Sequence, residues 1–247
     1  MGAEKEARNR VRPRKGGTMH RLRIFMMPLL AGNILYAFMN AGLLSGKNAV
    51  AGFCLLWAVD IFTLPIQGKL AYRHGLLGWA AACHAARFML TFGRAARTRL
   101  AAEIAWILQD LDRDAKAALW LSLHGEGSVE REPLYAASLA RYLLRAQAKT
   151  ALAMDLADTA LQGGNLARAH YVRGLCYLEA QDDYSAIASF ETARQLAAQN
   201  RDFVLAGFCY LGMGKAWSGI GEREYSRDHL LRAEIMLSFL PKAIRNV

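Results

Sequence analysis

The sequence predicts an all-α protein in which a two-helix transmembrane hairpin precedes an α-solenoid of about four helix pairs. Two observations predict the hairpin. Residues 24–46 carry no charged residue over 23 positions, and residues 48–68 form a second apolar run in which Asp60 is the one charge. A third observation predicts the solenoid over residues 97–247. Helix–turn–helix units can be laid out there with starts near Arg97, Pro133, Leu166 and Asp202, which are 36, 33 and 36 residues apart.

The membrane hairpin is predicted over residues 24–68. At about 1.5 Å rise per residue, a helix over 24–46 covers the roughly 30 Å hydrocarbon core with a little length left for tilt. The Ser-Gly-Lys-Asn sequence at 45–48 has the composition of a turn. Asp60 has two interpretations: a working intramembrane carboxylate, such as a proton or ion relay, or a side chain that reaches the interface or pairs with an asparagine of the first helix.

The excess positive charge lies beside the hairpin. The net charge is +10, yet residues 1–96 hold 13 Lys and Arg against 3 Asp and Glu, whereas residues 97–247 hold 18 of each. Residues 1–23 carry eight of these cations and no apolar face, which predicts a disordered basic tail; Met19 is an alternative start. The positive-inside rule places both termini in the cytoplasm, and we expect a bacterial inner membrane. The distribution argues against nucleic-acid binding.

Residues 69–96 are predicted as a basic amphipathic linking helix. On a helix, His84, Arg87, Thr91 and Arg94 fall on one stripe, opposite Leu76, Leu77, Trp79, Ala86 and Leu90. Such a helix fits the surface of an anionic lipid membrane, with Arg87 and Arg94 at the membrane surface. An ordinary helix that docks on the soluble domain and opens it fits the same pattern, and the sequence leaves both interpretations open.

Two consecutive helix pairs share five offsets of small and large side chains. The third pair has Gly174, Tyr177, Ala186, Phe190 and Ala193, and the fourth has Gly214, Trp217, Ser226, Leu230 and Ala233. The small residues let two antiparallel helices approach, and the large ones fill the space between them. This pattern resembles the tetratricopeptide repeat (TPR). The first two pairs keep only the second-helix spacing, at Ala115, Leu119 and Ser122 and at Ala153, Ala157 and Ala160.

The resemblance implies a groove, lined by the first helix of each pair, in which such repeats hold peptides or partner helices. Carried onto this chain, its positions are Arg168, Tyr171, Leu175 and Leu178 in the third unit, and Phe208, Leu211, Lys215 and Ser218 in the fourth. The set is mostly apolar with one cation per unit, which favours an amphipathic partner helix or peptide. Tyr171 and Arg168 are the expected anchors. Alternatively, these residues pack against neighbouring segments of the chain itself.

No motif for catalysis, metal binding or nucleotide binding stands out. The six histidines lack metal-ligand spacing, the four cysteines include no Cys-x-x-Cys pair, and no Gly-x-Ser-x-Gly occurs. We therefore expect no enzymatic activity, no cofactor and no small-molecule substrate. We expect a membrane-anchored adaptor or assembly factor that holds a protein partner at the cytoplasmic face of the membrane. The alternative is a small structural or coupling subunit of a membrane transport complex, with Asp60 as its functional intramembrane carboxylate.

Overall fold

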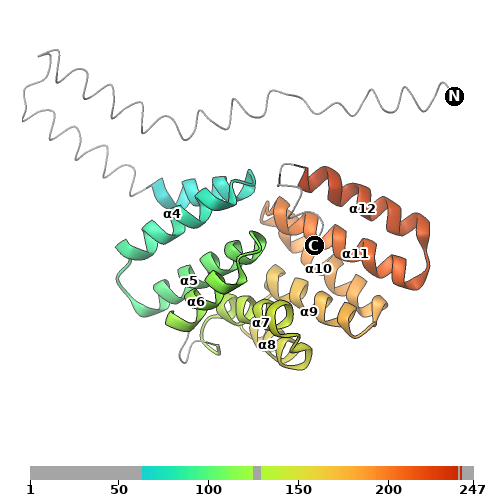
Figure 1. Cartoon of the computed structure of the whole chain (residues 1–247), viewed down its shortest axis with the longest axis horizontal. Coiled ribbons are helices and arrows are strands. Elements are labelled where there is room, and N and C mark those ends of the chain that lie inside the picture. Colours follow the sequence, from blue (N-terminus) through green and yellow to red (C-terminus); the bar gives the residue numbers. More distant parts are fainter. Residues whose placement is uncertain (1–62, 125–128, 239, 241–247) are drawn as a thin grey trace, which may run out of the picture. The chain divides into compact units, whose positions relative to one another are not determined.

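The structure, a computed structural model, describes residues 63–124, 129–238 and 240 (Figure 1). The chain divides into two compact units, Met1–Thr63 and Leu64–Val247, and almost all described residues belong to the second. The predicted tail over 1–23, the predicted hairpin as far as residue 62 and Asp60 lie outside the described residues. Within the described ranges, no helix is long and apolar enough to span a membrane.

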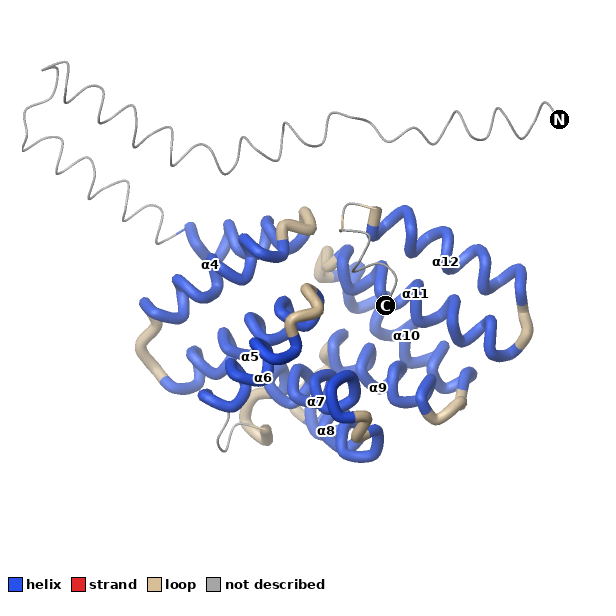
Figure 2. The backbone as a smooth tube through the Cα atoms, in the orientation of Figure 1, coloured by secondary structure: helices blue, strands red, loops and turns tan. Residues whose placement is uncertain are grey.

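The described residues form helices joined by short turns, and none of them lies in a strand (Figure 2). A helix over residues 63–73 comes first. It is followed by α4 (Leu77–Leu90), α5 (Arg94–Asp110), α6 (Asp114–His124), α7 (Pro133–Gln147), α8 (Thr150–Gln162), α9 (Ala167–Glu179), α10 (Asp183–Gln199), α11 (Phe203–Ile220) and α12 (Arg223–Leu237). This all-helical arrangement is consistent with the predicted α-solenoid.

The four predicted helix pairs are present, and their first helices form an inner layer. α5, α7, α9 and α11 begin within three residues of the predicted starts. Each packs on the second helix of its own pair, and α5 also contacts α7, α7 contacts α9, and α9 contacts α11. Side chains from four successive first helices therefore meet on one surface of the domain.

One turn geometry recurs at several helix ends. A residue with positive φ follows the helix, and the next N–H bonds to the carbonyl five residues back, which is the Schellman arrangement that satisfies terminal carbonyls. The N–H to O pairs are Leu76 to Ala71 (2.8 Å), Arg113 to Leu108 (2.8 Å), Asp182 to Tyr177 (2.9 Å), Asp202 to Ala197 (2.8 Å) and Glu222 to Trp217 (3.0 Å). The repeated turn fixes the antiparallel return of the chain after these five helices.

The small residues of the repeat motif lie where the helices approach most closely. A Cβ added at Gly174 would stand 2.7 Å from the Phe190 ring, and Phe190 is fully buried. A Cβ at Gly214 would stand 2.7 Å from Leu230, and the Ser226 hydroxyl donates to the Gly214 carbonyl at 2.8 Å. The glycines thus make room for the large residue of the facing helix, as the spacing predicts.

The predicted register of α6 is wrong. Ala115 and Leu119 were expected to face the core, but both are exposed, and Ala117 and Leu121 are buried instead. Ala117 and Leu121 are four residues apart and so share one helix face. That face packs with Leu100 and Ala101 of α5, so contact with the partner helix decides the register.

The predicted linking helix over 69–96 is not one helix. The chain turns at Gly75 and again at residues 91–93, where Gly93 has φ of 124°. The helix over 63–73 and α4 therefore form a further antiparallel pair, and α4 packs on α5. Leu64 to Gly68, predicted as the end of the membrane hairpin, belong to the compact repeat unit. Of the two interpretations of this segment, α4 fits the helix that docks on and opens the domain.

Candidate functional site

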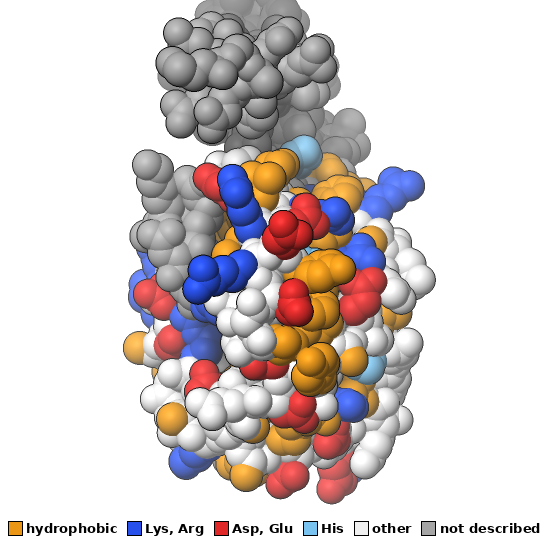
Figure 3. Space-filling view, turned by 90° about the vertical axis from the view of Figure 1, so that its right-hand side faces the viewer, with side chains coloured by type: hydrophobic (Ala, Val, Ile, Leu, Met, Phe, Trp, Pro, Cys, Tyr) orange, Lys and Arg blue, Asp and Glu red, His pale blue; other side chains and the backbone are white. Residues whose placement is uncertain are grey.

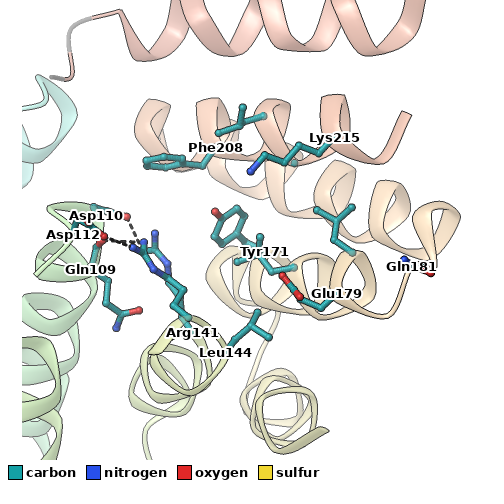
Figure 4. A pocket seen from close by; sticks show the side chains of 15 residues that line it. Gln109, Asp110, Asp112, Arg141, Leu144, Tyr171, Glu179, Gln181, Phe208 and Lys215 are labelled. Carbon is teal, nitrogen blue, oxygen red and sulfur yellow. Dashed lines mark hydrogen bonds and ion pairs between the residues drawn. The ribbon is translucent and has the colours of Figure 1, made fainter. Parts of the chain in front are cut away.

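A cavity of about 500 Å³ opens on the inner layer formed by α5, α7, α9 and α11. Six of the eight predicted groove residues line it, Tyr171, Leu175, Leu178, Phe208, Leu211 and Lys215, whereas Arg168 and Ser218 do not. Figure 4 shows Phe208 and Lys215 on α11 across from Tyr171 on α9. The repeat geometry thus brings together residues up to 44 positions apart in the sequence.

These six residues differ in how far solvent reaches them. Tyr171 and Phe208 are each only 6% exposed, whereas the three leucines are half-buried and Lys215 is exposed. The expectation that the groove exposes Tyr171 as an anchor is therefore wrong. Tyr171 packs within the chain, with ring centroids 6.2 Å from Trp106 and 5.8 Å from Phe190. A partner would meet the leucines and Lys215 first.

A buried ion pair forms the floor of the cavity. Nη1 of Arg141 on α7 lies 2.6 Å from Oδ1 of Asp110 on α5, and each residue is 2% exposed. Burial lowers the pKa of Arg141, but the neighbouring Asp110 carboxylate outweighs it and leaves that pKa raised. At the rim, Arg145 contacts Asp112 at 2.7 Å. The charges of the cavity are largely paired, so it has no strong preference for one sign of charge.

Two guanidinium groups lie over one indole ring beside this pair. Arg141 and Arg168 have their Cζ atoms 4.5 and 4.8 Å from the Trp106 ring centroid. Such cation–π contacts stabilise a cation that is partly removed from water. Trp106 therefore holds the two arginines in fixed positions on the inner layer.

Arg168, another predicted groove residue, lines a neighbouring cavity of about 320 Å³. The lining residues are Lys69, Tyr72, Arg73, His84, Glu103, Ile107, Arg168, Asn200 and Asp202. The Tyr72 hydroxyl donates to Oδ2 of Asp110 at 2.9 Å, and burial, then Asp110, raises the pKa of Tyr72 well above its ordinary value. Tyr72 lines this second cavity and bonds to Asp110, which lines the first, so the two cavities adjoin at this hydrogen bond.

The helix over 63–73 reaches across the domain at this point. Tyr72 bonds to Asp110 in the first repeat pair, and Nη2 of Arg73 donates to the carbonyl of Asn200 at 3.1 Å, between the third and fourth pairs. The side chain of Tyr72 also lies beneath the Arg168 guanidinium, 6.0 Å from ring centroid to Cζ. This helix thus connects the two ends of the inner layer.

Three residues were not identified from the sequence as part of the site: Asp110, Arg141 and Tyr72. A signal for Arg141 was present: Leu134, Ala137, Arg141 and Leu144 fall on one helix face, and three of the four are apolar. A charge on an apolar stripe indicates a buried, paired group. Tyr72 carried no such signal, because its contacts come from residues 38 and more positions away.

The predicted membrane-surface residues do not share one helix face. Arg87 is half-buried on α4, and Arg94 is exposed at the start of α5. His84, from the same predicted stripe, is buried, with Nδ1 3.0 Å from Oε2 of Glu103 on α5. The face that was expected to meet lipid therefore packs, in part, against the repeat domain.

The described residues carry no evident centre for metal or thiol chemistry. Within them, no group of three His, Cys, Asp or Glu side chains is placed to hold a metal ion. Cys83, Cys176 and Cys209 are buried free thiols, and burial raises the pKa of Cys176 to about 12. A thiol with such a raised pKa stays protonated near neutral pH and is a poor nucleophile.

Neither a family model nor a curated protein sequence matches this chain. Among solved structures, it is similar to the MamA protein, at 15% identity over 72% of this chain and 92% of that chain, with a TM-score of 0.40. It is also similar to BtubC from P. vanneervenii, at 15% identity over 87% of this chain and 90% of that chain, with a TM-score of 0.45. These values are too low to carry a function over from either protein.

Proposed function

We propose that this chain is a membrane-anchored adaptor or assembly factor that holds a protein partner in the groove of its repeat domain. The cavity on α5, α7, α9 and α11 is the observation that carries the proposal, because it gathers six residues that the resemblance to the tetratricopeptide repeat assigned to a groove. A mouth built from side chains of several repeats suits an extended partner.

The chemistry of the mouth favours an amphipathic partner helix or peptide. Leu175, Leu178 and Leu211 offer half-exposed apolar surface, and the rim carries Lys215 and Glu179, which are both exposed. The end of the domain that bears the α9–α10 and α11–α12 turns shows a band of hydrophobic side chains with acidic ones beside it (Figure 3). Apolar anchors flanked by both signs of charge match a helix with one apolar face.

The membrane anchor rests on the two apolar runs that precede the repeat domain. Residues 24–46 and 48–62 hold a single charge, and basic residues flank the pair on both sides. On this proposal the hairpin lies in a bacterial inner membrane, and both termini of the chain are cytoplasmic. Reporter fusions at residues 1 and 247 should both report cytoplasm, and a split result would contradict the hairpin.

Partner capture tests the adaptor role. The full chain is purified in mild detergent with its partners, which are identified by mass spectrometry and then titrated against variants. Leu211→Asp and Lys215→Glu should each weaken binding about ten-fold or more, that is by about 1.4 kcal/mol. Leu211→Asp places a charge against an apolar contact with the partner. Lys215→Glu reverses the charge at a contact with an oppositely charged group of the partner.

Leu152→Asp is the matched control, because Leu152 is an exposed leucine on α8 that does not line the cavity. It should leave binding unchanged. If Leu211→Asp and Lys215→Glu also keep full binding while their melting temperatures equal that of the wild type, the cavity is not the partner site.

A further inference from the structure

The connection between α4 and α5 carries unusually exposed apolar side chains. Phe92 is 96% exposed, Met89 is 78% exposed and Leu90 is 42% exposed. Large apolar side chains that stand together in water usually mark an interaction site. We call Met89, Leu90 and Phe92 the α4–α5 tip.

The chain segments that flank the tip are basic, and Glu132 at the start of α7 lies near Arg99. Between residues 61 and 102 the sequence contains no Asp or Glu, and arginines stand at 87, 94, 97 and 99 around the tip. The Arg97 guanidinium lies over the ring of buried Phe88, with Cζ 4.6 Å from the centroid, so it is held beside the tip. The first acid to follow, Glu103, is engaged by His84. The tip therefore combines protruding apolar groups with a cationic collar.

The tip lies level with the start of the repeat domain. The backbone of Gly68 packs against His84 and Cys83, which sets the antiparallel register of the helix over 63–73 and α4. Counting four residues outward along each helix places Leu64 level with Phe88. In Figure 1 the start of this helix and the α4–α5 connection lie at the same left-hand end. The chain thus enters the domain beside the tip.

We infer that the α4–α5 tip inserts Met89, Leu90 and Phe92 into the headgroup region of an anionic membrane leaflet, with the arginines on lipid phosphates. The inference rests on the membrane-anchoring part of the proposed function: if residues up to 62 leave the bilayer directly before Leu64, the tip stands at its surface. Apolar side chains gain by leaving water at that boundary, and nearby cations are attracted to anionic lipids.

This assignment differs from the amphipathic helix expected from the sequence. That expectation used a helix face that includes His84, which the structure buries against α5. The tip instead uses residues at the end of α4 and in the following turn. Of these, Met89 and Phe92 are largely uncovered by the described elements. Lipid contact would therefore be made by a protruding turn, and the predicted Arg87 and Arg94 would flank it.

Photocrosslinking in bilayers tests the inference. The full chain is placed in nanodiscs of phosphatidylcholine with phosphatidylglycerol, with benzoylphenylalanine at position 92 in one sample and at position 184 in another. Tyr184 is the matched control: it is an aromatic residue, 70% exposed, in the first turn of α10. Mass spectrometry should find phospholipid adducts at position 92 several-fold above those at position 184. Arg87→Gln with Arg94→Gln should lower the yield at 92, and pure phosphatidylcholine should lower it similarly.

The possible outcomes distinguish a failure of the lipid contact at the tip from a failure of the membrane anchor. Equal yields at 92 and 184 in chains that alkaline carbonate cannot extract from membranes would overturn the tip and leave the anchor standing. A chain that carbonate extracts would overturn the anchor, and the tip with it. Selective adducts at 92 that need both the arginines and the anionic lipid support the inference. Partner capture by the groove is measured separately and does not depend on Phe92.

Discussion

Asp110 joins three helices through one carboxylate. Its carboxylate accepts from Arg141 on α7 and from Tyr72 on the helix over 63–73, while its own backbone belongs to α5. A buried carboxylate is costly to desolvate, and two donors with good geometry offset that cost. The arrangement therefore fixes three helices relative to one another, provided that all its members are present.

Removing the carboxylate should destabilise the domain strongly. Asp110→Ala leaves the Arg141 guanidinium buried without its counter-charge and leaves the Tyr72 hydroxyl without an acceptor. We expect a loss of about 3–5 kcal/mol in the free energy of unfolding, which urea denaturation followed by circular dichroism would measure.

An exposed ion pair on the same domain provides the comparison. Arg232 and Asp228 lie 2.9 Å apart on the surface of α12, and both are about half exposed. Asp228→Ala should change stability by no more than about 0.5 kcal/mol. If Asp110→Ala costs as little as Asp228→Ala, the buried pair does not hold the helices together.

At the scale of the helix, sequence spacing predicted contacts well where both partners belong to one repeat. Gly174 with Phe190 and Gly214 with Leu230 follow directly from the motif offsets, because antiparallel neighbours joined by a short turn have a fixed register. In α6 the offsets pointed to Leu119, which is exposed. The preceding helix there lacks the Gly and aromatic positions, so packing against α5 set the face, and the motif carried no information about it.

The close approach at Gly174 is testable by adding one methyl group. Gly174→Ala forces a Cβ to within 2.7 Å of the Phe190 ring, which overpacking should penalise by about 1–3 kcal/mol. Gly78 in α4 is the control, because no heavy atom lies within 4 Å of its added Cβ. Gly78→Ala should stabilise by about 0.5–1 kcal/mol through lower backbone entropy. If thermal melts showed that both substitutions shift the melting temperature in the same direction, this account would be contradicted.

The domain as a whole should lose stability in alkali. Burial raises the pKa of Tyr171 to about 12, and it also raises the pKa values of Tyr72 and Cys209. An unfolded tyrosine ionises near pH 10. Between about pH 10 and 12 the folded state therefore holds protons that the unfolded state has released, and the free energy of unfolding falls as pH rises.

Tyr171→Phe isolates one contribution to this alkaline loss. The substitution keeps the ring that packs on Trp106 and Phe190 but removes the ionisable hydroxyl. Urea titrations between pH 8 and 12 should show a loss of stability smaller by about 1–3 kcal/mol in the variant than in the wild type. Equal slopes in the two proteins would show that Tyr171 ionises as easily in the folded state as in the unfolded one.

Contacts between residues of different repeats were predicted least well from the sequence. The groove side chains of α9 and α11 were assigned from the resemblance to the tetratricopeptide repeat, and the structure places six of them around one cavity. Arg168 fell into the neighbouring cavity, and the position of Tyr72 was not foreseen. Both depend on how far the stack of helices curves, which is the sum of small rotations between repeats. Local spacing does not encode that sum.

The helix over 63–73 has a mechanical consequence. In an open solenoid each repeat contacts only its neighbours, so tension applied at one end peels repeats away one after another. Here Tyr72 and Arg73 attach the leading helix to Asp110 in the first pair and to Asn200 between the third and fourth pairs. A pull on the chain before Leu64 is therefore shared between two attachment points that lie 90 positions apart in the sequence. Tension applied to the chain before Leu64 would therefore load the first and the later repeats together, and would not peel them away one after another.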